Sequence, residues 1–247
     1  MSSRPEEPLV PASTPSNDPG PAPPPRTSLW LGLVSVSALV AAQTHAILTS
    51  PPDADMGHLQ KIMYVHVPAA WMTFISFFVV LVFSVRYLWR RRENDDLLAA
   101  SAAEVGATFN GLTLMLGMIW GRPAWGVWWA WDARLTSTLV LFLIFVGYLA
   151  LRAFVDDTDQ RARWSAAVGV IGAINVPIVY MSVTWWRTLH QPPSSPATLD
   201  AAYTLGLRLN AIALLLVLIY FIRKRYEIAR LERATEHAAE AVAMGGS

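Results

Sequence analysis

Residues 62–85 read IMYVHVPAAWMTFISFFVVLVFSV, an uncharged run long enough to cross a lipid bilayer. About 20 apolar residues span the hydrocarbon core as a helix. The sequence contains six such apolar segments, this run included. It therefore predicts an all-α integral membrane protein, a bundle of six transmembrane helices. The other five are Thr27–Pro52, Val105–Gly121, Leu135–Leu151, Trp164–Trp186 and Ala201–Ile222, the last interrupted only by Arg208.

The composition agrees with a membrane location. Of the 247 residues, 54% are apolar and 15% are charged, whereas soluble domains average about 25% charged residues. The chain has no cysteine, which excludes disulfides and thiolate metal sites. The net charge of +1 indicates no nucleic-acid partner, and the basic residues are better explained by membrane topology.

The lysines and arginines divide unequally between the two sides of such a bundle. Fourteen fall in the two terminal segments and in the second and fourth connections between helices. Four fall on the other side, and they are Lys61, Arg122, Arg134 and Arg187. Positive charge is enriched on the cytoplasmic side. We therefore expect a multi-pass protein of the cytoplasmic (inner) membrane, with both termini in the cytoplasm and the connection between helices three and four outside.

Three regions follow from this arrangement. Residues 1–26 hold nine of the seventeen prolines, so we expect a disordered cytoplasmic tail. Residues 27–225 form the membrane domain, in which helix two starts near residue 67 and helix three, capped by residues 94–96, ends near residue 120. Helix six is expected to end at residues 223–225. Residues 226–247 are expected to form a second cytoplasmic tail, a frayed surface helix as far as Met244.

The predicted outer connection between helices three and four is rich in tryptophan. Residues 120–131 hold five of the eleven tryptophans in the chain. A tryptophan ring has a large apolar surface and a single polar N–H. A cluster of such rings indicates a platform for a large, flat, apolar molecule, although an aromatic belt at the membrane surface is the alternative. The five are Trp120, Trp125, Trp128, Trp129 and Trp131.

Two histidines are predicted at the same side of the membrane. His66 lies at the mouth of helix two, and His190 lies just past helix five. A packed bundle would bring both to opposite faces of one ligand, and neutral imidazoles are good axial ligands for haem iron. The alternative for each is a hydrogen-bonded residue at the membrane interface.

Charged residues around the tryptophans fit the edge of a porphyrin, which carries two carboxylates. Arg122, Arg134 or Arg187 would meet these propionates through charge-assisted hydrogen bonds, and contact with lipid headgroups is the alternative. We expect Asp132 to orient Arg134 or a tryptophan N–H. Arg208 lies inside helix six, where a charge costs about 2.5 kcal/mol at the helix centre, so it either reaches the same ligand or extends towards the membrane surface.

Nothing in the sequence indicates bond-breaking chemistry. The chain has no phosphate-binding glycine loop and no serine or cysteine nucleophile beside a base. Two classes of protein remain, one that holds and presents a ligand, and an ABC-type permease subunit that exports haem or another small solute. A permease concentrates polar features at the bilayer midplane, whereas the distinctive residues here lie at the outer rim.

Three motifs resemble one known family. Residues 125–136 read WGVWWAWDARLT, residues 63–70 read MYVHVPAA and residues 185–191 read WWRTLHQ. The first is similar to the tryptophan-rich WWD motif, and together the three resemble the cytochrome c maturation protein C family (CcmC) of haem-handling membrane proteins. The resemblance covers about residues 28–225.

The resemblance implies a function. Haem b would be bound without a covalent bond on the outer face, with His66 and His190 as axial ligands of the iron and the WWD loop, residues 120–136, against the ring. The chain would present this haem to the chaperone CcmE, which attaches it covalently. The other expected partners are CcmD, the ABC-type subunits CcmA and CcmB, and membrane lipid, and CcmA would hydrolyse the ATP.

Overall fold

The computed structural model describes residues 26–192 and 199–245. Within these residues the chain forms six long helices and no strand, and each helix is long and apolar enough to cross a membrane. The predicted all-α, six-helix fold is therefore confirmed. The helices are α1 (Arg26–Thr49), α2 (Met63–Arg90), α3 (Glu93–Trp125), α4 (Ala133–Phe154), α5 (Thr158–Trp185) and α6 (Ala201–Gly245), with a 3₁₀ helix, η1 (His58–Ile62), before α2.

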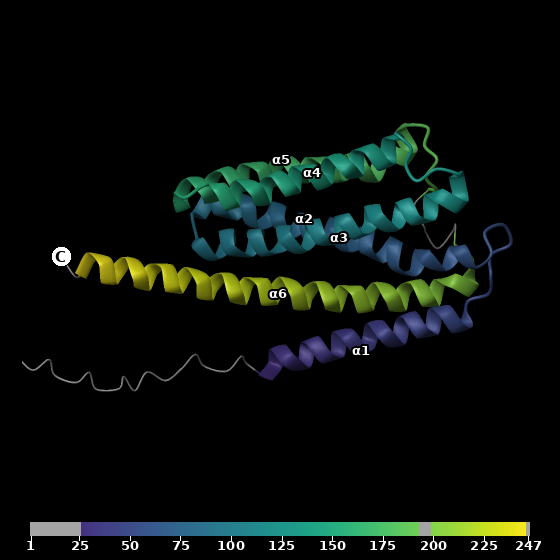
Figure 1. The fold of residues 1–247 in the computed structure, drawn as a ribbon, viewed down its shortest axis with the longest axis horizontal. Coiled ribbons are helices and arrows are strands. Elements are labelled where there is room, and N and C mark those ends of the chain that lie inside the picture. Colours follow the sequence, from purple (N-terminus) through teal and green to yellow (C-terminus); the bar gives the residue numbers. More distant parts are fainter. Residues whose placement is uncertain (1–25, 193–198, 246–247) are drawn as a thin grey trace, which may run out of the picture.

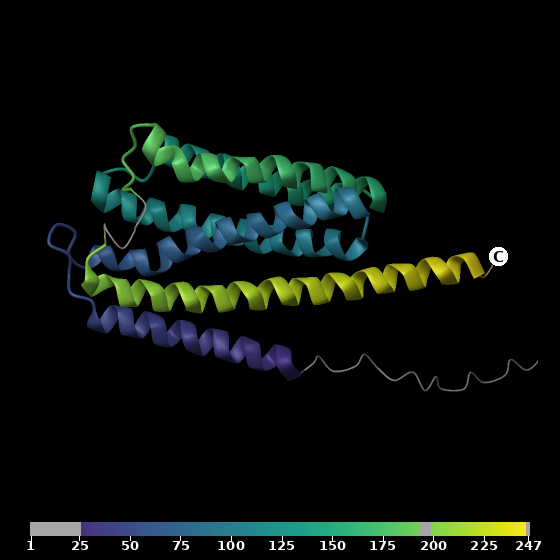
Figure 2. The same ribbon diagram turned by 180° about the vertical axis from the view of Figure 1, so that it is seen from behind.

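The helices pack in an order that differs from their order in the chain. α1 packs on α6, α6 packs on α2 and α3, and the α4–α5 pair covers the opposite side of α2 and α3. The start of α1 and the end of α6 lie at one end of the bundle, as both views show (Figure 1, Figure 2). The connections α1–α2 and α3–α4, and the described residues between α5 and α6, lie at the other end, which we call the tryptophan end.

The core lies where α2, α3, α4 and α5 meet. The rings of Phe77 and Phe145 stack with centroids 3.6 Å apart. Gly106 lets α3 approach closely, because a Cβ atom at this position would lie 2.7 Å from the Phe77 ring. Large apolar side chains such as Phe78 and Ile171 are exposed on the outside of the bundle, as contact with lipid requires.

The ends of α2 and α3 at the tryptophan end differ from the prediction. α2 begins at Met63 rather than near residue 67, so His66 belongs to its first turn. α3 continues to Trp125 and ends at Gly126, whose positive φ of 79° lets its N–H bond to the Arg122 carbonyl. The predicted loop is therefore helical over its first residues, and residues 126–132 form the connection.

The predicted cap of α3 is also wrong. Arg92 is the N-cap residue and no side chain caps this end. The acidic side chains expected to do so are buried in ion pairs between helices instead. Asp96 receives two hydrogen bonds from Arg152, at 2.6 and 2.8 Å, and Asp95 lies 3.1 Å from Arg86.

α6 does not end at residues 223–225, because it continues without a break to Gly245. Contacts with the rest of the bundle hold this extension. Arg233 is buried and lies 2.8 Å from Glu93 at the start of α3, and it donates to the Thr158 hydroxyl at 3.1 Å. Residues 226–245 are thus part of the helical body. The predicted disordered tail, residues 1–26, lies outside the described residues except for Arg26.

Candidate functional site

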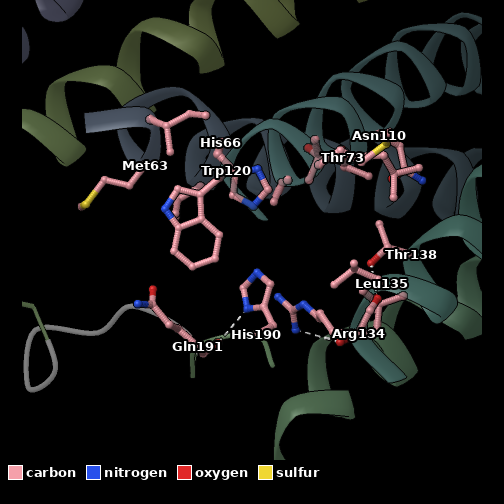
Figure 3. A pocket seen from close by; sticks show the side chains of 18 of the residues that line it. Met63, His66, Thr73, Asn110, Trp120, Arg134, Leu135, Thr138, His190 and Gln191 are labelled. Atoms are coloured by element: carbon pink, nitrogen blue, oxygen red, sulfur yellow. Dashed lines mark hydrogen bonds between the residues drawn. The ribbon is translucent and has the colours of Figure 1, made fainter. Parts of the chain in front are cut away.

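A cavity lies at the tryptophan end, between α2, α3, α4 and the connection that follows α5. Six of the residues singled out in the sequence line it, and Figure 3 labels four of them: His66, Trp120, Arg134 and His190. Most of the other lining side chains are apolar, among them Met63, Trp71 and Phe74. The six are His66, Trp120, Trp125, Trp129, Arg134 and His190.

The two histidines face each other across this cavity (Figure 3). Their ring centroids are 6.2 Å apart and the rings are tilted by 32°. Two metal–imidazole bonds of about 2 Å each place the ligating nitrogens about 4 Å apart and the ring centres about 6 Å apart. The separation of His66 and His190 therefore has the length that one metal ion between them requires.

The tautomer of His190 leaves one nitrogen free to bind a metal. Its Nδ1 lies 2.8 Å from the Gln191 carbonyl oxygen. Because a carbonyl oxygen only accepts, Nδ1 carries the proton and Nε2 keeps its lone pair. Burial lowers the pKa of His190, the nearby Arg134 acts in the same direction, and the bond to Gln191 opposes both. The ring is therefore neutral at neutral pH, as a metal ligand must be.

Asp132 fixes the segment that carries His190. One carboxylate oxygen accepts from the Leu135 N–H at 2.8 Å and so caps α4. The other accepts from the Thr188 hydroxyl at 2.6 Å and the Leu189 N–H at 3.0 Å. The Thr188 hydroxyl in turn accepts from the His190 N–H at 3.1 Å. Asp132 thus joins the start of α4 to the His190 segment, which differs from the expectation that it orients Arg134 or a tryptophan.

The four arginines considered in the sequence lie in different places. Arg134 lines the cavity and donates to the carbonyl oxygens of Val179 at 2.8 Å and Tyr180 at 3.2 Å, near the end of α5. Arg122 is exposed and donates to the Gly126 carbonyl at 2.5 Å.

Two of these arginines lie away from the cavity. Arg187 is exposed and makes no polar contact with the described residues. Arg208 is exposed on α6 between Leu205 and Ile212, which are exposed too. Only Arg134 among the four considered is therefore placed to contact a ligand in this cavity.

The tryptophans divide into two sets. Trp120, Trp125 and Trp129 line the cavity, and the first two meet edge to face with centroids 5.1 Å apart. Trp128 and Trp131 do not line it, and they are 56% and 77% exposed. The connection after α3 thus has one face towards the cavity and another face directed outward.

Sequence reasoning missed the inner part of this cavity. Asn110 of α3 lines it and is fully buried, and neither of its amide atoms has a hydrogen-bond partner. Three threonines also line the cavity, and Figure 3 shows two of them, Thr73 and Thr138, on the side of Asn110. The third, Thr113, follows Asn110 by one turn of α3. The signal was present in the sequence, because a polar side chain inside an apolar span is a candidate for function.

Comparison with known proteins gives one family. Residues 24–239 match the family model described as "Heme exporter protein C", CcmC. The chain is 42% identical over 207 residues to heme exporter protein C of Bradyrhizobium diazoefficiens, covering 81% of this chain and 78% of that protein. It is 34% identical over 221 residues to the protein of the same name from Escherichia coli K12, covering 88% and 90%. The chain therefore belongs to the heme exporter protein C family, CcmC.

Proposed function

We propose that this protein binds haem b without a covalent bond, with His66 and His190 as the two axial ligands of the iron. The observation that carries the proposal is the 6.2 Å separation of the two imidazole rings, across a cavity lined by Trp120, Trp125 and Trp129. The rings of these tryptophans offer apolar surface to a porphyrin. The family name adds support for haem as the ligand.

We place the haem site on the outer face of the cytoplasmic membrane. The residues that line the cavity belong to the tryptophan end of the bundle, which lies opposite to the start of α1 and the end of α6 (Figure 1). The arginine-rich connections after α2 and α4 lie with those two ends, and the positive-inside rule puts them in the cytoplasm. A site at the outer end suits presentation to another protein better than passage of a solute through the membrane.

The acceptor in this proposal is the haem chaperone CcmE, which would attach the haem covalently. Trp128 and Trp131 lie beside the cavity and are exposed, and exposed aromatic rings are typical anchors of protein interfaces. CcmD, CcmA and CcmB would complete an ABC-type complex, in which ATP hydrolysis belongs to CcmA. The part of this chain would be to hold haem and to offer it.

The visible spectrum of the purified full-length protein tests the haem proposal. We expect a low-spin spectrum typical of two histidine ligands, and its loss in both His66→Ala and His190→Ala. His58→Ala is the matched control, since His58 is exposed at the same end of the bundle and does not line the cavity. Wild-type spectra from both cavity variants would refute the assignment of these ligands.

A further inference from the structure

The cavity continues beyond the two histidines towards the middle of the bundle. Asn110 lies ten residues before Trp120 on α3, which is about 15 Å along the helix axis. Thr73 lies seven residues after His66 on α2, about 10 Å further from the tryptophan end. We call Thr73, Asn110, Thr113 and Thr138 the inner subsite, and all four line the cavity.

Asn110 has unused hydrogen-bonding capacity in this subsite. The side chain is 0% exposed, and both Nδ2 and Oδ1 lack a partner among the described residues. Inside a membrane an unsatisfied polar group is strongly destabilising, because no bulk water is there to bond it. A side-chain amide offers one donor group and one acceptor. The missing partner is therefore a group that both donates and accepts.

The threonines of the inner subsite impose a further requirement. Each hydroxyl donates to a backbone carbonyl of its own helix: Thr73 to Ala69 at 3.0 Å, Thr113 to Phe109 at 2.9 Å and Thr138 to Arg134 at 2.7 Å. Only lone pairs remain to face the cavity. An ionised carboxylate would meet these lone pairs with its own negative charge, whereas a protonated carboxyl group can donate its O–H.

We propose that the inner subsite receives one propionic acid group of the bound porphyrin in its protonated form, through two hydrogen bonds to the Asn110 amide. This inference rests on the proposed haem function. Burial in an apolar environment favours the neutral form of a carboxyl group. The amide N–H can donate to the carbonyl oxygen of the acid, and the amide oxygen can accept from its O–H. The second propionate leaves the same edge of the ring, and Arg134 would hold it in its ionised form.

This assignment orients the porphyrin in the cavity. The carboxyl edge points inward to Asn110 and Arg134, and the opposite edge, with its vinyl groups, points to the tryptophan end. Met63, Trp120 and Trp125 line the cavity at that end beside Gln60 and Gln191, and the three apolar side chains offer contacts to vinyl and methyl groups. Asn110 would therefore be a residue that selects porphyrins with a free carboxyl group.

Titration of the purified full-length protein with two porphyrins tests this role. The probes are iron protoporphyrin IX and its dimethyl ester, which lacks both acidic protons, and the affinity ratio of acid to ester is compared between variants. We expect Asn110→Leu to reduce this ratio by about five-fold or more, since a buried polar partner is lost, while the low-spin spectrum with two histidine ligands persists. Asn110→Ala, which leaves space, should do the same.

Asn175→Leu is the matched control, because Asn175 is already bonded to the Ser137 carbonyl at 3.0 Å and does not line the cavity. It should leave the ratio unchanged. An unchanged ratio in both Asn110 variants would overturn the proposal and leave water as the partner of the amide. A wild-type protein that binds neither porphyrin would refute the haem function itself, and the inner subsite with it.

Discussion

At the scale of single residues, Thr188 links two parts of the site. Its hydroxyl donates to Asp132 and accepts from the His190 N–H. Asp132 can keep its bond to Leu135 without Thr188, so a change at Thr188 separates the position of the histidine from the cap of α4. Removal of Asp132 itself would lose both, and the lost cap alone costs about 1 kcal/mol.

We therefore predict that Thr188→Val weakens iron ligation by His190 and leaves the fold intact. The ring would move more freely, so the low-spin haem fraction should fall and added imidazole should restore it, while the melting temperature of the apo-protein changes little. Thr188→Ser keeps the hydroxyl and should behave as the wild type. A fully low-spin Thr188→Val protein would show that the loop holds His190 without this bond. Visible and electron paramagnetic resonance spectra measure the fraction.

Local sequence identified some of these residues and could not identify others. His66, His190 and the three tryptophans that line the cavity, Trp120, Trp125 and Trp129, could be singled out because their types and positions along the predicted helices are visible in the sequence. The partner of Asp132 could not be found, since Thr188 lies 56 residues further along the chain. The sequence could not show which of the four arginines lines the cavity either. Only the packing of the helices decides that Arg134 faces the cavity while Arg187 and Arg208 do not.

At the scale of helices, buried ion pairs hold the ends of neighbouring elements together. Asp96 on α3 and Arg152 on α4 are mostly buried and share two hydrogen bonds. Asp159 and Arg163 form a pair within α5 whose side chains are both more than half exposed. The two pairs lie in or near the arginine-rich connections but differ in their environment.

We predict that Asp96→Ala destabilises the protein by about 3–5 kcal/mol, because it leaves the buried Arg152 charge without a partner. Asp159→Ala should cost at most about 1 kcal/mol, as exposed pairs contribute little. Thermal unfolding in detergent, followed by circular dichroism, measures both. Equal losses of stability in the two variants would mean that the burial of the Asp96–Arg152 pair has no energetic consequence.

The number of helices was predictable, and several of their ends were not. Hydropathy is a local property, so six apolar runs gave six helices. The end of α6 depends on Arg233 and its contacts with Glu93 and Thr158, residues that lie far away in the sequence. The apolar run ends near residue 222. The Ala-, Glu- and Arg-rich residues that follow indicate a surface helix to about Met244, but not that this helix continues α6 without a break.

At the scale of the whole molecule, the distribution of charge predicts the orientation in the membrane. A reporter domain fused after Arg225 should be found in the cytoplasm, and one inserted between Ala54 and Asp55 should be found outside. The second position lies in the turn closed by the Asp53–Gly57 bridge, where an insertion leaves every helix intact. If the reporter at the Ala54–Asp55 position is found in the cytoplasm, the predicted membrane orientation is reversed and the cavity lies at the inner face.

The connection between α3 and α4 has one face towards the cavity and one face directed outward, and these two faces allow the binding of haem to be tested separately from its transfer. Trp129 lines the cavity, whereas Trp131 is 77% exposed and meets Trp129 edge to face. We predict that Trp131→Ala reduces the covalent loading of CcmE more than the haem content, because an exposed aromatic anchor of an interface contributes about 2 kcal/mol or more to binding when it is central. Trp129→Ala should instead reduce the haem content first.

Haem content and chaperone loading must be measured on the same preparations to make this comparison. Trp89→Ala is the control, since Trp89 is 81% exposed at the far end of α2, and both quantities should stay at wild-type levels. If Trp131→Ala lowers loading only in proportion to haem, the outward face does not dock the chaperone. Transfer would then depend on the porphyrin edge that the cavity itself leaves open, and Trp129→Ala and Trp131→Ala would differ only in how much haem they retain.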